Sequence, residues 1–201
     1  MSMIPVNLAV EDALSETIVR RLLDYTDRSY AVGVAYGRRG YGYLRGTIRG
    51  WNRAASGIPF IVLTDLDHHL CPTALIQEWL PEPKSPNLLL RVAVREVEAW
   101  LLADRTNLAN YLSVSPTRVP AEPDSLPDAK ASLVDLAGRS RSREVRAGIA
   151  PKRGSTAKQG PDYNASLSDF ARSHWNINAA RLSSPSLART IARLGVFTPV
   201  W

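Results

Sequence analysis

The sequence has few residues that could cross-link the chain or anchor it in a membrane. Its 201 residues include one cysteine, Cys71, so a disulfide framework is excluded and a reducing compartment is expected. No apolar run approaches membrane-spanning length, and the first residues lack the cationic segment and apolar core of a secretory signal. These absences predict a soluble, cytoplasmic protein without a membrane partner.

Histidine is also scarce, and the glycine-rich part of the chain lacks a nucleotide-loop pattern. His68 and His69 are neighbours, but no other His or Cys lies at ligand spacing, which favours ordinary polar residues over a transition-metal site. The glycines between residues 37 and 50 are not followed by Lys-Ser or Lys-Thr, so a Walker-type phosphate loop is excluded.

Acidic residues become rare towards the C-terminal end. Residues 1–135 contain 14 Lys and Arg against 16 Asp and Glu, whereas residues 136–201 contain 11 against 3. An acidic part joined to a basic part suits a polyanionic substrate that the basic part holds and the acidic part acts on. The alternative is that the basic part is only a solvated surface.

With 45% hydrophobic residues, the chain can bury one sizeable core.

Apolar patterns predict an alternation of strands and helices. Short runs rich in β-branched and aromatic residues predict strands at residues 4–10, 30–36, 58–63 and 88–94. Between and after them, helical spacing predicts helices from Asp12, up to Ala55, from Pro72, and through Trp100 and Leu112. The predicted fold class is therefore α/β, with a central, mostly parallel sheet of about four strands flanked by helices.

The remaining residues are expected to add a smaller, basic part to this core. A Pro-rich loop at residues 113–127 precedes a short predicted helix at 128–137. The last predicted helix starts at S-P-S-L, with Ser184 as its cap and Pro185 in its first position, and runs to Leu194. Residues 1–135 are expected to form the core, and residues 136–201 a basic loop and helical extension packed on it within one structural domain.

Acidic side chains follow three of the four predicted strands. Glu11 follows the first, Asp65 and Asp67 end the third, and Glu96 and Glu98 follow the fourth. The carboxyl ends of parallel strands meet at one edge, where open α/β sheets bind ligands, and alternation along an extended chain projects both aspartates the same way. Because carboxylates held close together repel, a Mg²⁺ site is predicted there. The alternative for Asp-x-Asp is an acidic turn.

Glu16 is a further candidate for the same edge. It follows Glu11 by about one and a half helical turns, so both side chains are expected to lean the same way. The alternative is a carboxylate placed favourably near a helix N-terminus.

Two basic segments predict contacts with nucleic acid. Within residues 37–53, arginines alternate with Tyr41, Tyr43 and Trp51, so guanidinium groups are expected on phosphates and aromatic faces on exposed bases. A solvated loop and helix face is the alternative. Residues 139–158 carry seven basic residues and one acid and are expected to be mobile and to face phosphates. The predicted nucleic-acid-binding residues are Arg38, Arg39, Arg45, Arg49, Arg139, Arg141, Arg143, Lys152, Arg153 and Lys158.

The order of these motifs resembles the TOPRIM fold, which is shared by type IA topoisomerases, primases and the nucleases of the overcoming-lysogenization-defect (OLD) family. The likeness rests on V-E-D-A-L-S-E at residues 10–16 and V-L-T-D-L-D at residues 62–67. Over nearly its full length the chain is also similar to a prokaryotic TOPRIM-like family, through R-E-V-E-A-W-L-L-A-D, P-D-A-K, G-P-D-Y and S-P-S-L in that order.

The resemblance implies a nuclease that hydrolyses or nicks phosphodiester bonds, with DNA as the expected substrate. It implies one Mg²⁺ or Mn²⁺ held by Glu11, Asp65 and Asp67, and a second held by Glu16 with Glu96 or Glu98. The implied catalytic residues are Glu11, Asp65, Asp67, Glu96 and Lys152, and the implied metal ligands are Glu11, Glu16, Asp65, Asp67, Glu96 and Glu98.

Two features of the resemblance leave alternatives open. A lysine near the scissile phosphate is implied, and Lys152 and Lys130 are both candidates. OLD-like enzymes have Gly where Asp12 stands, and their second acid lies one position before Glu16.

Relatives work with a separate or fused ATPase, so a partner ATPase in a phage-defence or mobile-element system is expected.

Two other functions are consistent with the motifs. A phosphatase of the haloacid dehalogenase type also has D-x-D after a buried strand, with the first Asp as nucleophile, but T-D-L-D-H-H lacks the Gly-Thr expected there. The other is a non-catalytic TOPRIM-like subunit that binds nucleic acid or regulates a partner. The altered Glu-Asp motif favours this subunit, whereas the energetic cost of keeping buried acids argues against it.

Overall fold

A computed structural model describes residues 3–201, which form two compact units. Residues 3–94 with 189–201 contain the β-sheet and are called the sheet unit, and residues 95–188 are called the helical unit. The predicted division at residue 135 lies inside α6 (Ala129–Gly138), a helix of the helical unit. The chain therefore leaves the sheet unit after residue 94 and returns to it within α10 (Pro185–Val196).

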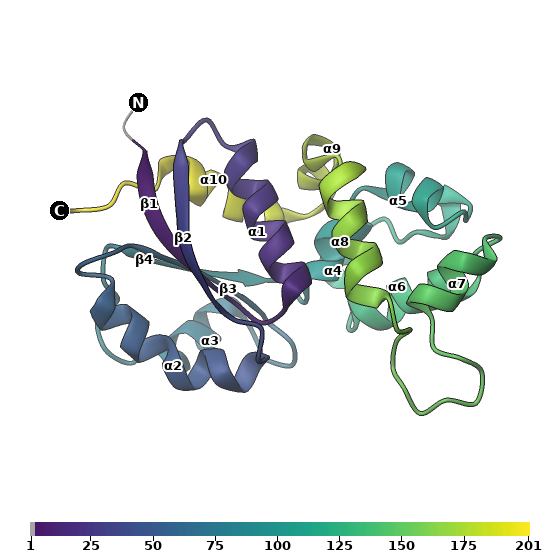
Figure 1. Ribbon diagram of the computed structural model, residues 1–201, viewed down its shortest axis with the longest axis horizontal. Helices are drawn as coiled ribbons and strands as arrows, with labels where there is room; N and C mark the ends of the chain where they lie inside the picture. Colours follow the sequence, from purple (N-terminus) through teal and green to yellow (C-terminus); the bar gives the residue numbers. More distant parts are fainter. Residues whose placement is uncertain (1–2) are drawn as a thin grey trace. The chain divides into compact units, whose positions relative to one another are not determined.

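The sheet unit confirms the predicted α/β fold class. Its strands are β1 (Ile4–Val10), β2 (Tyr30–Gly37), β3 (Phe60–Asp65) and β4 (Leu88–Ala93). All neighbouring pairs are parallel, in the order β2-β1-β3-β4 (Figure 1). The strands β1 and β3 are almost continuously apolar, which suits a sheet with helices on both faces.

Helices cover the two faces of this sheet. Figure 1 shows α1 (Ala13–Tyr25) on one face and α2 (Tyr41–Ala54) with α3 (Pro72–Trp79) on the other. The α1 stripe that was predicted from spacing is buried, and α3 begins at the predicted proline. The core under α2 and α3 is apolar and aromatic, and it includes Leu44, Ile48, Trp51, Phe60, Val62, Leu75, Trp79, Leu90 and Val92.

The C-terminal segment fastens the amino ends of the outer strands. The Tyr30 hydroxyl, at the start of β2, donates to the Leu194 carbonyl (2.5 Å). At the start of β4, the Asn87 side chain donates to the Val200 carbonyl (2.8 Å) and accepts from its N–H (2.7 Å). These contacts explain why residues 189–201 belong to the sheet unit although they are the last in the chain.

The helical unit differs most from the sequence-based prediction. Its elements are α4 (Val97–Leu102), α5 (Arg105–Tyr111), the 3-10 turns η1 (Pro116–Arg118) and η2 (Pro123–Ser125), α6, α7 (Arg143–Ile149), α8 (Tyr163–Ser173), α9 (Ile177–Ser183) and the start of α10. The single helix predicted through Leu112 is two helices, and α8 and α9 were not predicted. Part of the basic segment 139–158 is the helix α7, so it is not an open loop throughout. No helix within residues 3–201 combines the length and the apolar character needed to cross a membrane.

Candidate functional site

The connections of the sheet diverge between β1 and β3. The chain leaves β1 through α1 towards β2, and it leaves β3 through α3 towards β4 on the other side. Open α/β sheets bind their ligands at such a point, beyond the carboxyl ends of the strands. Glu11 directly follows β1 and Asp65 is the last residue of β3, so both lie at this edge.

The Glu11 carboxylate joins the ends of these two strands. Its Oε1 accepts a hydrogen bond from the Thr64 hydroxyl (2.6 Å) and one from the Asp65 backbone N–H (2.9 Å). The structure therefore brings Glu11 into contact with the backbone of the Asp-x-Asp motif, across more than fifty residues of sequence. Thr64 was not singled out in the sequence, and its place inside a buried strand gave no reason to do so.

Electrostatics at this edge favour a proton or a cation. Burial raises the pKa of Glu11, and the negative charges of Asp67 and Asp12 raise it further. The hydrogen bonds from Thr64 and Asp65 act in the opposite direction but do not outweigh the increase. An ionised Glu11 is thus held at a cost, in the field of neighbouring carboxylates.

Asp67 reaches this edge by a turn and not by strand alternation. The strand ends at Asp65, and Asp67 has a left-handed backbone with φ of 48°. The Leu66 N–H donates to the Ala93 carbonyl at the end of β4 (2.9 Å), and the Leu66 carbonyl accepts from the His69 N–H (3.0 Å). The prediction that alternation alone orients both aspartates is therefore wrong, although aspartate tolerates this conformation.

Glu16 has partners of its own. Its Oε1 accepts from the Arg20 Nε–H (2.9 Å) and its Oε2 from the Arg38 Nε–H (2.7 Å). Burial raises the pKa of Glu16, but the bonds and charges of the two arginines outweigh burial and leave the pKa below its ordinary value. The structure thus places Glu16 between two guanidinium groups, where both carboxylate oxygens are already bonded.

A short glycine loop positions Arg38 beside this edge. The Arg38 N–H donates to the Val10 carbonyl and the Gly40 N–H to the Glu11 carbonyl, both at 3.0 Å. Gly37 has φ of 105°, and a Cβ built on it would lie 2.0 Å from the Val10 carbonyl oxygen. Only glycine permits this approach, which holds the loop against the end of β1.

Asp12 has a structural role that accounts for its place in the Glu-Asp motif. Its side chain accepts a hydrogen bond from the Ser15 N–H (2.8 Å) and so caps the N-terminus of α1. Aspartate is a preferred cap residue, so the type alone could have indicated this role. The structure therefore assigns Asp12 to capping α1.

The donors at this edge are carboxylate oxygens, which hard cations such as Mg²⁺ and Mn²⁺ prefer. Across residues 3–201, no group of three or more His, Cys, Asp or Glu side chains is arranged to hold a metal ion. Mg²⁺ usually keeps several waters and binds through one or two carboxylates and substrate phosphates. Glu11 and the Asp-x-Asp motif therefore offer ligand atoms of the type that Mg²⁺ takes, but three such side chains are not arranged around one ion within residues 3–201.

The other predicted acids lie in the helical unit, where three motifs meet. Glu98 is 1% exposed, and its Oε1 accepts from the Tyr163 hydroxyl (2.7 Å) and lies 3.5 Å from the Lys130 ammonium. Glu96 accepts a hydrogen bond from the Lys130 N–H (2.7 Å). R-E-V-E, P-D-A-K and G-P-D-Y are thus assembled around one buried carboxylate. Burial raises the pKa of Glu96, and the charges of Glu98 and Asp128 add to this effect.

Three of the predicted nucleic-acid-binding arginines on or beside α2 contact other side chains or backbone groups of the sheet unit. Arg39 lies over the Tyr43 ring (5.4 Å to its centre), and Arg45 pairs with Glu78 (2.8 Å). The Arg49 Nε–H points to the Trp79 carbonyl at 3.5 Å. Tyr41, Arg45, Arg49, Glu78 and Trp79 line a cavity of about 590 Å³. Trp51 is buried in the core, so its face is not available to stack on a base, contrary to expectation.

Next to this cavity, His69 is part of a polar chain. The Trp79 indole N–H donates to the Tyr41 hydroxyl (3.3 Å), which lies 2.7 Å from His69 Nε2. His69 Nδ1 is 3.6 Å from a carboxylate oxygen of Glu78. This environment agrees with treating the histidine as an ordinary polar residue.

The predicted nucleic-acid-binding residues of the helical unit lie in two places. Arg118, Arg139 and Arg141 line a cavity of about 690 Å³ whose lining contains no Asp or Glu. Arg118 was missed because it stands alone in the sequence, inside a Pro-rich loop. Exposed side chains between α7 and α8, and at the start of α7, supply the rest: Arg143, Lys152, Arg153 and Lys158. Figure 1 shows the segment between α7 and α8 as a long open loop.

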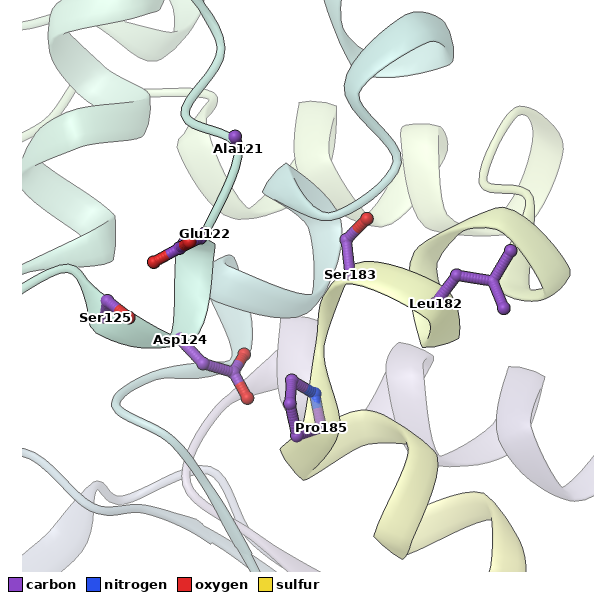
Figure 2. Close-up of a pocket in the computed structure, with 7 residues that line it drawn as sticks. All are labelled: Ala121, Glu122, Asp124, Ser125, Leu182, Ser183 and Pro185. Atoms are coloured by element: carbon purple, nitrogen blue, oxygen red, sulfur yellow. The ribbon is translucent and has the colours of Figure 1, made fainter.

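A further cavity adjoins the S-P-S-L motif and is about 390 Å³ in volume. Figure 2 shows the Asp124 carboxylate directed towards Pro185, at the start of α10. Asp124 accepts from the Ser184 hydroxyl (2.6 Å) and from the Ser186 N–H (2.8 Å), and Ser184 caps the helix at the Leu187 N–H (3.2 Å). The cap and first-position proline predicted here are confirmed. This motif therefore has a structural role in starting α10.

Comparisons of this chain with protein-family models, curated proteins and solved structures found no match.

Proposed function

We propose that this chain is a metal-dependent phosphodiesterase that nicks or hydrolyses nucleic acid, with DNA as its substrate. The observation that carries the proposal is the Glu11 carboxylate, bonded to Thr64 and Asp65 at the point where the sheet connections diverge. The order of a strand with Glu and a later strand with Asp-x-Asp supports a TOPRIM-like site. A separate ATPase partner and a role in phage defence or a mobile element extend the proposal by that resemblance alone.

In this proposal, one or two of the carboxylates of Glu11, Asp65 and Asp67 would hold Mg²⁺ or Mn²⁺ at a time, and water and the substrate phosphate would supply the other ligands. Bound there, such a cation activates a water molecule and stabilises the leaving oxygen of a phosphodiester. Thr64 and the Asp65 N–H fix one oxygen of Glu11, so its other oxygen has a defined direction. Arg38, whose loop is bonded to the backbone of Glu11, offsets negative charge on the phosphate.

The resemblance also implies a second metal ion and further catalytic residues, and these have less support in the structure than the site at Glu11. Glu16 is bonded to two arginines, so we assign it to holding Arg38 and not to a metal. Glu96, Glu98 and Lys130 form a cluster within the helical unit, and Lys152 lies in an exposed loop. A catalytic role for these residues stays a prediction of the resemblance.

A second candidate function is a non-catalytic subunit that binds nucleic acid. It is favoured by one observation, that no group of three or more metal-binding side chains is assembled within residues 3–201. In that case, Glu11 and the Asp-x-Asp motif hold the strand ends together, and the arginines alone engage the substrate.

Plasmid nicking separates these functions. Purified protein is incubated with supercoiled plasmid and Mg²⁺, Mn²⁺ or EDTA, and the relaxed form is quantified over time. We expect nicking with a divalent cation, and a loss of about 100-fold or more in Asp65→Asn, because the variant removes a charged metal ligand. Asp24→Asn is the matched control, since Asp24 is an exposed aspartate on α1 outside the site.

The remaining outcomes are equally informative. Nicking that persists in Asp65→Asn at the native rate would contradict the proposed site. Binding of nucleic acid without cleavage, even with a neighbouring ATPase added, would support the non-catalytic subunit. Release of phosphate from small monoesters, lost in Asp65→Asn, would instead support a phosphatase with Asp65 as its nucleophile.

A further inference from the structure

Arg91 occupies an unusual place in the sheet. It lies in β4, an outer strand, and pairs in register with Leu63 of β3. Its neighbours Leu90 and Val92 belong to the core under α2 and α3, so alternation along the strand directs Arg91 to the opposite face. There its Nε–H points to the Thr190 hydroxyl of α10 at 3.4 Å, a long and weak contact.

Further cations influence the pKa of this guanidinium and of the nearby Lys84. Burial lowers the pKa of Arg91 to about 10, and the positive charges of Arg193 and Arg189 contribute to the decrease. Burial likewise lowers the pKa of Lys84, with contributions from Arg193 and Arg91. Lys84 donates to the backbone carbonyl of Leu88 (2.8 Å), which carries no full charge. The four residues Lys84, Arg91, Arg189 and Arg193 are called the cation cluster.

Within residues 3–201, no carboxylate is in ion-pair contact with the cation cluster. Arg189 and Arg193 also stand four residues apart on α10, where like charges repel. A half-buried guanidinium among like charges is costly to keep unless an anion joins it.

We propose that the cation cluster is a binding site for a phosphate group. The planar guanidinium of Arg91 suits two phosphate oxygens at once, and Arg189 and Arg193 supply further charge from α10, whose Thr190 contacts Arg91. The phosphate belongs to the backbone of a nucleic acid strand or to a free phosphate compound. The site goes beyond the proposed function, because it requires neither a metal ion nor cleavage.

The ordinary explanation is that Arg91 protects an edge strand. Charged residues that point inwards on outer strands hinder edge-to-edge pairing of sheets. That explanation accounts for one arginine, but it does not account for three more cations brought to the same place from α10 and from the loop before β4.

The test uses the full-length protein in EDTA, so that cleavage cannot interfere. Inorganic phosphate is titrated by calorimetry, and a short fluorescent oligonucleotide is titrated by anisotropy, both at constant ionic strength. The variant is Arg189→Ala/Arg193→Ala. Arg172→Ala/Arg181→Ala is the matched control, because it removes the same charge from exposed positions of α8 and α9.

We expect the Arg189→Ala/Arg193→Ala protein to bind phosphate at least about tenfold more weakly, since two charge-assisted contacts are lost, while the control binds as the native protein does. If the phosphate belongs to a nucleic acid strand, the oligonucleotide affinity measured by anisotropy shows the same loss. Anisotropy titrations repeated at several salt concentrations then give a slope of log affinity against log salt that is shallower by about 0.7 per lost contact. Loss for phosphate alone assigns the site to a free phosphate compound.

Two results with the Arg189→Ala/Arg193→Ala protein would overturn the proposal. One is the absence of phosphate binding in the native protein together with an unchanged oligonucleotide affinity in Arg189→Ala/Arg193→Ala. The other is an equal loss of binding in this variant and its control, which would show only an effect of net charge. Arg91→Met provides a second check, because it should abolish the rise in melting temperature that phosphate gives the native protein, and a retained rise contradicts the site. Asp65→Asn should bind phosphate normally, so failure of this site and failure of the nuclease are distinguishable.

Discussion

Hydrogen bonds hold the Glu11 carboxylate in place although its surroundings disfavour its negative charge. Burial and the charges of Asp67 and Asp12 raise its pKa, while Thr64 and the Asp65 N–H keep its position. Functional sites commonly keep such charges where a neutral residue would make the fold more stable.

We therefore predict that Glu11→Gln stabilises the protein at neutral pH by roughly 0.5 to 2 kcal/mol. The glutamine oxygen can still accept from Thr64 and Asp65, but it carries no charge to bury. Because the pKa is raised by folding, the difference should be absent below the ordinary glutamate pKa of about 4.3 and should grow as pH rises through the folded-state pKa. Thermal melting from acid to neutral pH measures it.

The control for this prediction is Glu122→Gln, an exposed position at which the same substitution should change the melting temperature little. Mg²⁺ should raise the melting temperature of the native protein and not that of Glu11→Gln, because only a ligand that binds the folded state stabilises it. A variant that melts below the native protein at neutral pH would show that the charge of Glu11 supports the fold.

At the scale of elements, the loop between β2 and α2 is built around close backbone contacts. Gly37 brings the chain against the Val10 carbonyl, and the following residues bond to the carbonyls of Val10 and Glu11. The glycines inside α2 are different, because a Cβ on Gly42, Gly46 or Gly50 would meet nothing within 4 Å.

Two Gly→Ala substitutions should accordingly have opposite signs. Gly37→Ala should destabilise the protein by roughly 1 to 3 kcal/mol or more, because φ is positive and the new Cβ collides with the Val10 carbonyl. Gly46→Ala should stabilise it by roughly 0.5 to 1 kcal/mol, because alanine is the better residue in an exposed helix interior. Urea denaturation of both variants tests this, and effects of the same sign would contradict it.

At the scale of the whole molecule, contacts between residues far apart in the chain organise each unit. In the helical unit, Glu98 receives a hydrogen bond from Tyr163 and lies near Lys130, and the Lys130 ammonium is 5.9 Å from the centre of the Tyr163 ring. The Trp100 indole donates to Ser186 (2.6 Å), which joins the start of α10 to α4. Motifs separated in sequence thus share one core.

We predict that Tyr163→Phe destabilises the protein by roughly 1 to 3 kcal/mol, because a buried carboxylate loses a hydrogen-bond donor. Tyr43→Phe is the matched control, since the Tyr43 hydroxyl makes no hydrogen bond to the residues that the structure describes, while its ring packs on Trp51. Chemical denaturation followed by tryptophan fluorescence measures both. Equal effects of the two substitutions would show that the Tyr163 hydroxyl contributes nothing.

The sequence by itself determined the elements of the sheet and much of its edge. Apolar runs and cap residues act locally, so β1 to β4, the start of α3 at Pro72 and the cap at Ser184 were predictable from neighbouring residues. The rule that parallel strands end at one edge also predicted that Glu11 and Asp65 would lie there.

Only the tertiary structure decided which partner each side chain has. Thr64 beside Glu11, the two arginines on Glu16 and the turn that carries Asp67 depend on contacts across many residues, which no local pattern contains. The cation cluster likewise arises because β4 and the end of the chain fold together. Local propensity acts within a few residues, whereas burial and charge act between whatever residues the fold brings into contact.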